Sequence, residues 1–365
     1  MFKEKIQAIL CGMLALGLVV VAPVQADCSN DSCDCNGPCF TSCCDWNLCP
    51  NLCSDFSISA ELLIWKPCFT NLDYGYTTSS TFAADTATSG RYKYVDPSWQ
   101  PGFRIRMDKD NVWCNGWDFN AAYTYINASD SSGVSSSVTD GVQSTRIPPS
   151  IGINLASAPF SLRANSHLQY RNLDLLFATD YMCCPCQKLT PFFGVQWLRV
   201  DNNTQQKLTD SIAAPNTNYY AAKWTGDTWA VGWKMGSRFN YVLCDCLDLD
   251  VVASGSLLAG MHKNVLTVRE LTGASSANHT NWQFKSDDCA CIPSWDFSVG
   301  LSYAQCFCGM QFQFKIAYEF VQLIGMPSPA SLFGVSTTNT VAQRGAPNDG
   351  TLGFHGVNLG VTATF

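Results

Sequence analysis

The chain has 365 residues, a formal net charge of −7 and 14% charged residues, well below the roughly 25% of soluble domains. Its acidity argues against a nucleic-acid partner. After residue 26 no run of 18 apolar residues remains, so no transmembrane helix is predicted there.

Residues 1–26 have the pattern of a secretory signal peptide. Two lysines, Lys3 and Lys5, precede an apolar run over 6–22, and small residues lead to a predicted cleavage site after Ala26. A lipoprotein signal would need a small residue before the modified cysteine, but Asp27 precedes Cys28. We therefore expect a cleaved, exported chain.

Cysteine is the most unusual feature of the exported part, which keeps 19 of the 20 cysteines. Residues 27–54 form a segment with few apolar residues, predicted to lie in the periplasm and to be ordered by disulfides. Its cysteines are Cys28, Cys33, Cys35, Cys39, Cys43, Cys44, Cys49 and Cys53. Because 19 is odd, at least one thiol is free or bonded to another molecule.

From residue 55 to 365 the sequence alternates with period 2, which is typical of strands with two different faces. The clearest case is 310–320, where Met310, Phe312 and Phe314 alternate with Gln311 and Gln313. The predicted strands are 56–64, 100–107, 117–125, 168–179, 189–200, 229–238, 247–251, 295–303, 310–320 and 357–365. A soluble β-sandwich also alternates, but aromatic residues on the apolar face and charges and glycines on the other favour a membrane barrel.

Long and short connections alternate between these strands. Long loops are predicted at 67–99, 127–165, 202–227, 261–294 and 322–350, with short turns near 108–111, 183–188, 244–246 and 306–309. This is typical of outer-membrane barrels with periplasmic turns and external loops. We expect an all-β, antiparallel transmembrane barrel of about 10 strands, with a range of 8 to 16, and both termini in the periplasm.

Several strands resemble one known family. The closing strand ends on Phe365 and resembles the assembly signal of outer-membrane barrels. Together with the segments QPGFRIR (100–106), GWDFNAAYTY (116–125), NLDLLFA (172–178) and LTPFFGV (189–195), it is similar to the Legionella-type major outer membrane protein family, also found in Chlamydia-related bacteria. The resemblance implies a porin-like barrel. The Cys-rich segment departs from the Legionella members and resembles the disulfide-linked envelope of chlamydia-like organisms.

If the apolar faces contact lipid, the alternate charged residues point into the lumen. These predicted pore-lining residues are Glu61, Arg104, Arg106, Asp118, Lys234, Arg238, Asp248, Asp250, Asp296, Lys315 and Glu319. Facing charges at a constriction would select ions. Alternatively the charges pair with one another and plug a narrow barrel, because wide aqueous channels need about 16 strands.

Most remaining cysteines fall at the predicted short turns. They are Cys114, Cys183, Cys184, Cys186, Cys244, Cys246, Cys306 and Cys308. Residues two apart on a strand lie about 6.6 Å apart, which is poor for pairing with each other. Their expected partners are the N-terminal segment, other turns or neighbouring envelope proteins. A metal or redox role for the C-x-x-C at 183–186 is the weaker interpretation, since no second pair completes a site.

We therefore expect an outer-membrane, porin-like channel for small hydrophilic solutes and ions that is also a disulfide-cross-linked envelope component. A surface adhesin, using loops such as 128–143, or a structural barrel without a pore are the alternatives. The four scattered histidines match no catalytic motif, so neither enzyme activity nor a cofactor or metal is expected. Expected partners are membrane lipid, Cys-rich envelope proteins or further copies, the barrel assembly machinery and possible host surfaces.

Overall fold

The protein is described from a computed structural model. It describes residues 56–70, 72–78, 90–110, 112, 116–135, 141–144, 160–184, 187–210, 219–244, 246–271, 281–307, 310–328, 331–333, 342–344 and 350–365. The predicted signal peptide and Cys-rich segment lie outside these residues, as do Cys114, Cys186 and Cys308. No helix long and apolar enough to cross a membrane is found in the described part of the chain.

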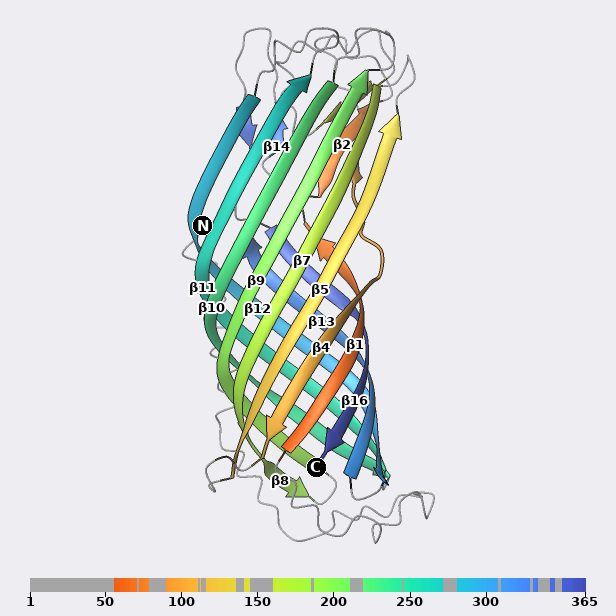
Figure 1. Cartoon of the computed structure of the whole chain (residues 1–365), viewed down its shortest axis with the longest axis vertical. Helices are drawn as coiled ribbons and strands as arrows, with labels where there is room; N and C mark the ends of the chain where they lie inside the picture. Colours follow the sequence, from red (N-terminus) through yellow and green to blue (C-terminus); the bar gives the residue numbers. More distant parts are fainter. Residues whose placement is uncertain are drawn as a thin grey trace.

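Ten antiparallel strands form a closed barrel (Figure 1). They are β1 (Phe56–Phe69), β4 (Gln100–Lys109), β5 (Trp117–Ser135), β7 (Phe160–Thr179), β9 (Gln187–Asp210), β10 (Tyr219–Cys244), β11 (Leu247–Leu271), β12 (Asn281–Phe307), β13 (Met310–Met326) and β16 (Gly350–Thr364). Each pairs with its neighbour in this order, and β16 pairs with β1 to close the ring. The predicted strand number is confirmed, and every predicted strand overlaps one of these.

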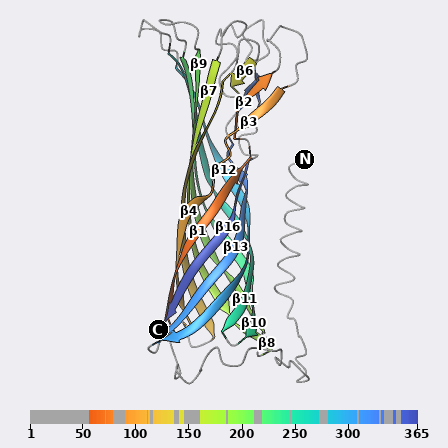
Figure 2. The same cartoon turned by 90° about the vertical axis from the view of Figure 1, so that its right-hand side faces the viewer.

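Six short strands accompany the ten barrel strands in the part of the chain that the structure describes. A small sheet joins β2 (Asp73–Thr78), β3 (Gly90–Tyr94) and β6 (Gly141–Ser144), and Figure 2 shows it beside the upper ends of the long strands. The hairpin is formed by β14 (Ser331–Phe333) and β15 (Ala342–Arg344), and β8 (Tyr181–Cys184) pairs with the start of β9. We call the end of the barrel with short connections the turn end, and the opposite end the loop end.

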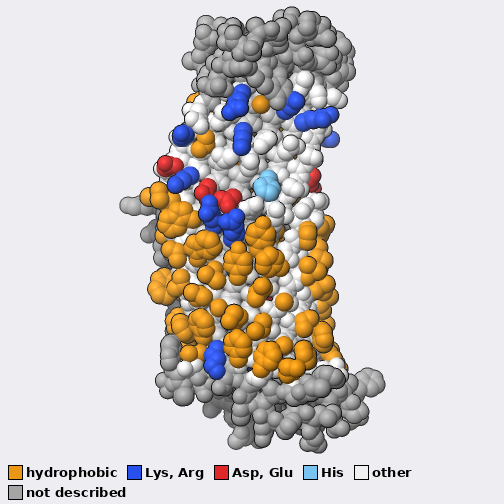
Figure 3. All heavy atoms as spheres, viewed as in Figure 1, with side chains coloured by type: hydrophobic (Ala, Val, Ile, Leu, Met, Phe, Trp, Pro, Cys, Tyr) orange, Lys and Arg blue, Asp and Glu red, His pale blue; other side chains and the backbone are white. Residues whose placement is uncertain are grey.

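An apolar belt covers the half of the barrel nearer the turn end. Figure 3 shows it on the side turned to the viewer, and exposed apolar residues of β1, β12 and β13 continue it. It is formed by outward side chains on every second residue, such as Phe314, Ile316, Tyr318 and Phe320 of β13, which are 41 to 53% exposed. Large apolar side chains stay this exposed on a barrel wall when lipid, not water, covers them. The predicted assignment of the apolar strand faces to the outside is therefore correct.

The strands are longer than predicted, and the predicted loops 127–165, 202–227 and 261–294 are wrong for much of their length. For example, β9 continues to Asp210 and β10 already begins at Tyr219. Beyond the belt the pattern reverses, because outward residues such as Lys207 are polar while inward ones such as Leu208 are buried. A search for apolar residues facing lipid misses such strands, since here the outside faces water.

The chain closes the barrel with its last residues. The backbone N–H of Phe365 donates to the carbonyl of Phe56 at 3.0 Å, and Ser57 lies opposite Thr364. The first and last strands of the barrel therefore meet at the turn end. The side chain of Phe365 is half exposed there.

Candidate functional site

The period-2 alternation sends a second set of side chains into the lumen. On β1 the inward residues are Ser59, Glu61, Leu63 and Trp65, and all four are buried. Nine of the eleven predicted pore-lining residues line a single cavity of about 430 Å³ in the turn-end half of the lumen. They are Glu61, Arg104, Arg106, Asp118, Lys234, Arg238, Asp296, Lys315 and Glu319. Of the other two, Asp250 is buried and Asp248, two residues away on β11, is partly buried.

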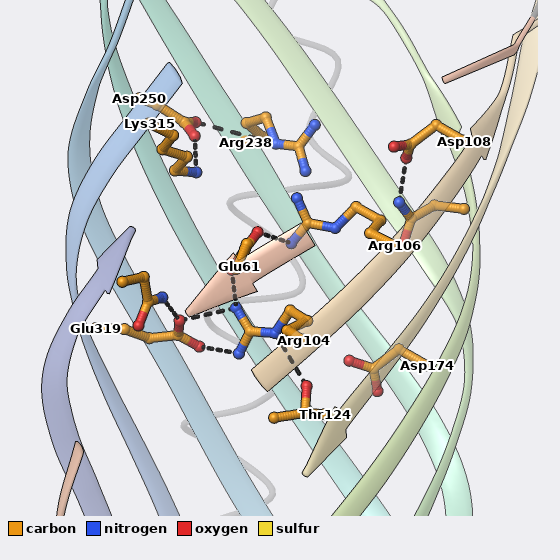
Figure 4. Close-up of polar contacts among 12 residues, drawn as sticks. Glu61, Arg104, Arg106, Asp108, Thr124, Asp174, Arg238, Asp250, Lys315 and Glu319 are labelled. Atoms are coloured by element: carbon orange, nitrogen blue, oxygen red, sulfur yellow. Dashed lines mark hydrogen bonds and ion pairs between the residues drawn. The ribbon is translucent and has the colours of Figure 1, made fainter. Parts of the chain in front are cut away.

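Arg104 is the centre of the charged lumen (Figure 4). Its guanidinium donates from Nη1 to Glu61 Oε2 at 3.0 Å, and from Nη1 and Nη2 to both oxygens of Glu319 at 2.9 and 2.8 Å. Its Nε donates to Thr124 Oγ1 at 2.9 Å, and Arg106 lies 3.4 Å from Glu61. The fork geometry of Arg suits two carboxylates at once.

A second cluster centres on Lys234 of β10. Its Nζ donates to Asp174 Oδ2 at 3.0 Å and also contacts Asp296, which accepts a further hydrogen bond from Ser254 at 3.2 Å. Asp174 was missed in the sequence because it lies in the weakly patterned stretch 168–179. Its place between outward Leu173 and Leu175 was the available signal.

A third cluster joins Asp250 to Lys315, with Arg238 Nε at 3.9 Å. Five cationic and five acidic side chains thus form one charged network, which we define as Glu61, Arg104, Arg106, Asp174, Lys234, Arg238, Asp250, Asp296, Lys315 and Glu319. The charges balance and pair with one another. Each member of the network lies within 4 Å of a member of opposite charge.

An apolar layer crosses the lumen on the loop-end side of this network, and we call it the apolar seal. Nine of the ten barrel strands contribute to it. Its members are Leu63, Trp65, Ile126, Ala128, Leu168, Tyr170, Leu198, Val200, Ala230, Leu258, Ala290, Ile292, Val321, Leu323, Met326, Leu352 and Phe354. Leu63, Leu198, Ala230, Leu258, Ile292, Leu323 and Leu352 are all 0% exposed. The sequence analysis missed this layer, because it considered only the charged inward residues.

Trp65 links the charged network to the apolar seal. Its Nε1 donates to Asn358 Oδ1 at 2.6 Å, and Asn358 in turn donates to Glu319. The guanidinium carbon of Arg104 lies 5.6 Å from the Trp65 ring, within cation–π range. A Cβ at Gly356 would lie 2.8 Å from Trp65 Cδ1 and 2.1 Å from the Ile64 carbonyl, so glycine is needed for this packing.

The lumen is also filled beyond the seal. His262 is buried and hydrogen-bonds through Nδ1 with Thr228 Oγ1 at 2.8 Å, while its Nε2 lies 3.1 Å from the Gly325 carbonyl. Further toward the loop end is a second apolar cluster of Tyr74, Val95, Leu162, Ala164, Leu208, Ala222, Trp224, Leu266 and Val268. Tyr74, on β2, comes from the small sheet, which thus packs inside the long strands.

The described cysteines differ in part from the prediction. Cys246 is disulfide-bonded and buried, whereas Cys244 carries a free thiol although a disulfide was predicted there. Cys68, Cys289 and Cys291 are free and exposed, and the sequence analysis gave them no role. The other predicted disulfide cysteines have side chains outside the described residues. Among described residues, no cluster of three or more His, Cys, Asp or Glu side chains is arranged to hold a metal ion.

A closed antiparallel barrel with an apolar belt outside and charged residues inside is the architecture of a bacterial outer-membrane β-barrel. The comparison with protein families agrees with this class. The chain belongs to the Legionella pneumophila major outer membrane protein precursor family, whose model matches residues 48–365. The predicted family is therefore confirmed.

Solved structures similar to the chain are outer-membrane barrels of several kinds. The outer membrane protease OmpT from Escherichia coli is 10% identical with a TM-score of 0.38, covering 85% of this chain and 97% of that one. The translocator domain of the autotransporter NalP from Neisseria meningitidis is 11% identical, with a TM-score of 0.29 and coverage of 87% and 91%. The Pseudomonas putida toluene transporter TodX is 6% identical, with a TM-score of 0.27 and coverage of 85% and 89%. No curated protein matches the chain, and these likenesses carry no inference about activity.

Proposed function

We propose that the protein is a structural outer-membrane barrel whose lumen is sealed in the resting state. The observation that carries this proposal is the apolar seal, which packs side chains from nine strands across the barrel. Water and hydrated ions avoid such a layer, because it offers them no hydrogen-bond partner. The narrow lumen agrees with this, since barrels near eight strands are just filled by their side chains.

The charged network supports the same role. Arg104, Glu61 and Glu319 have side chains only 5 to 12% exposed and satisfy one another. A buried network of this kind is stable only when its partners stay in place, so it favours one fixed lumen geometry over a mobile one. We infer that it tethers strands across the barrel interior.

The turn end provides a place for cross-linking to neighbouring envelope proteins. The free thiol of Cys244 lies there, and β1, which follows the predicted Cys-rich segment 27–54 in the sequence, begins at the same end. A thiol that is free among the described residues is available to another molecule. Disulfides between barrels and periplasmic proteins would give the envelope mechanical strength.

A porin-like channel is the second candidate function, and the cavity of about 430 Å³ favours it. Its lining includes Asp110, Lys188 and Thr364, which lie at the turn end, and it reaches inward to the charged network. Hydrophilic solutes could enter such a vestibule. Passage would then require Trp65 and its apolar neighbours to move aside.

Single-channel recording in planar bilayers separates the two candidates. We expect the purified full-length protein to give no conductance steps. A Trp65→Ala/Leu198→Ala variant should give steps, and Val299→Ala in the lipid-facing belt serves as the matched control. Heat-modifiable migration shows that each variant is folded. Stable steps from the unmodified protein would overturn the sealed barrel and support the porin-like channel.

Electrophoresis with and without reductant tests the cross-linking separately. We expect disulfide-linked oligomers of the protein in envelopes prepared without reductant. Cys244→Ser should weaken them, whereas Cys291→Ser on the outward face of β12 should not. A monomer on both gels would remove the cross-linking part of the proposal and leave the sealed lumen untouched.

A further inference from the structure

A basic surface lies outside the barrel, beyond the apolar belt on the loop-end side. The strands β7, β9, β10 and β11 run on past the belt and present polar outward faces there. Figure 3 shows Lys and Arg side chains gathered above the belt on the side turned to the viewer. We define the basic row as Arg163 of β7, Lys207 of β9, Lys223 of β10 and Arg269 of β11.

The strand register brings these four cations together. Arg163 lies directly opposite Lys207, Lys207 opposite Ala221, and Ala221 opposite Arg269. Lys223 is two residues from Ala221 on the same face of β10. Directly opposite residues have Cβ atoms about 5 Å apart, and like charges in that position are destabilising. A net charge of −7 for the whole chain makes this concentration of positive charge more unusual.

Three of the four cations have no ion-pair partner among the described residues. The four residues line one shallow groove of about 660 Å³, and its described lining contains no acidic residue. Among described residues, Arg163, Lys223 and Arg269 form no ion pair. An anion in the groove would remove the repulsion between these side chains, and Arg and Lys both bind phosphate oxygens well.

The charged side chains next to the belt form ion pairs, unlike those of the basic row. There Arg199 lies 3.2 Å from Asp227 and 3.5 Å from Asp201, and Arg171 lies 3.9 Å from Asp201. These charges sit at the belt margin and neutralise one another. The basic row is therefore a separate site and not part of a general cationic rim.

The height of the row indicates which anion it meets. Lys223 is six residues beyond Trp229, the last belt residue of β10, which corresponds to about 15 Å above the belt for a tilted strand. Phospholipid headgroups extend only about 7 Å beyond the hydrocarbon on each side. The row thus lies above that level, where the outer leaflet of an outer membrane carries the sugars of lipopolysaccharide.

The neutral groups around the row fit sugars. Asn165, Gln205, Thr225 and Thr267 line the same groove and supply amide and hydroxyl groups. A neighbouring depression shares Asn165 and Gln205 and is lined by further hydroxyl, amide and imidazole groups and by the carboxylate of Asp130. Together they offer hydrogen bonds to sugar hydroxyls next to the cations.

We propose that the basic row binds phosphate groups on the sugar part of outer-leaflet lipopolysaccharide. One phosphate would bridge the repelling side chains of adjacent strands, while the amide and hydroxyl groups hold the sugar that carries it. This binding would fix glycolipid against the wall formed by β7, β9, β10 and β11. It requires no opening of the lumen, so it stands independently of the sealed-barrel proposal.

Calorimetric titration tests this with a soluble probe. Full-length protein in phospholipid nanodiscs is titrated with deacylated lipopolysaccharide that keeps its phosphates, with the same oligosaccharide after dephosphorylation, and with inorganic phosphate alone. The test variant is Arg163→Gln/Lys223→Gln/Arg269→Gln. The matched control, Arg91→Gln/Lys93→Gln/Lys285→Gln, removes the same charge elsewhere on the surface.

We expect the phosphorylated oligosaccharide to bind, and the test variant to weaken binding on the order of 10- to 100-fold. The control should stay within about twofold, dephosphorylation should remove most binding, and high salt should weaken it. Inorganic phosphate alone should bind far less tightly. Equal binding by the test variant, or by the dephosphorylated oligosaccharide, would overturn the proposal. So would binding of a sulfated glycan such as heparin without binding of the phosphorylated oligosaccharide.

Discussion

Arg104 and Glu319 are separated by 215 residues in the sequence and are joined by two parallel hydrogen bonds inside the barrel. The pair connects β4 to β13 across the two strands that lie between them, β1 and β16. These are the strands at which the barrel closes. The contact therefore links the strands on either side of the β1–β16 pairing from inside the lumen.

Removal of the Arg104 charge should destabilise the barrel strongly. Arg104→Gln leaves Glu61 and Glu319 buried without their shared cation, which costs about 3–5 kcal/mol. Urea unfolding in lipid vesicles measures the loss. Adding Glu61→Gln and Glu319→Gln should recover much of it, and Arg171→Gln, whose side chain is 32% exposed, should change little. A fully stable Arg104→Gln protein would contradict the role of the network.

The second cluster allows a comparison between a buried and an exposed lysine. Lys234→Met should cost several kcal/mol, because Asp174 and Asp296 then face each other across the lumen. Lys188→Met breaks the pair with Asp180, whose side chains are 44% and 36% exposed, and should cost less than about 1 kcal/mol. The same unfolding measurement ranks the two. Equal losses would show that burial does not control these ion pairs.

The close packing around Trp65 leaves no room for a side chain at residue 356. Gly356→Ala should cost about 1–3 kcal/mol, since a Cβ there meets both the indole and the Ile64 carbonyl. Tryptophan fluorescence and unfolding report the change. Gly133→Ala is the control, because a Cβ at Gly133 approaches no atom closer than 3.4 Å. The packing argument fails if both variants unfold alike.

A charged side chain introduced into the lipid-facing belt should destabilise the barrel. Ile316→Lys lies near the middle of the belt on β13 and should cost about 2–4 kcal/mol in bilayers. Gln283→Lys on the exposed part of β12 beyond the belt should be nearly neutral. Urea unfolding in lipid vesicles compares the stabilities of the two variants. A tolerated lysine at residue 316 would mean that lipid does not cover this face.

Thiol labelling tests the orientation of the barrel in the membrane. After reduction, a membrane-impermeant maleimide should label Cys289 on intact cells, because this exposed thiol lies on the loop-end side of the belt. Cys244 at the turn end should react only after the outer membrane is permeabilised. Single-cysteine variants read by mass shift give the result. The reverse pattern would place the loop end in the periplasm.

Much of the barrel was predictable because lipid and lumen impose opposite chemistry on neighbouring residues. Phe314 and Lys315 alternate in this way within the belt, and Lys315 indeed reaches Asp250 inside. Nine of the predicted inward charges share one cavity for the same reason. Alternation alone thus located the part of each strand within the belt and the charged side chains that share this cavity.

The apolar seal and the role of Asp174 could not be predicted without knowing which strands pair and in which register. Leu198 and Leu258 are inward residues of different strands, and only the register places them in one layer. The same holds for Asp174, which gains its role from Lys234 on a strand 60 residues away. Beyond the belt, polar residues occupy both faces, as with outward Gln205 and buried Gln206, so period-2 alternation no longer separates strand from loop there.

The bond between Phe365 and Phe56 also has a consequence for biogenesis. The strand β16, which comes after all other barrel strands in the sequence, supplies the partner that β1 needs, so a polypeptide without β16 keeps two unpaired edges that invite aggregation. Closure of the barrel must therefore wait until β16 has been translocated. A chain truncated before β16 would leave a product that cannot complete its cylinder.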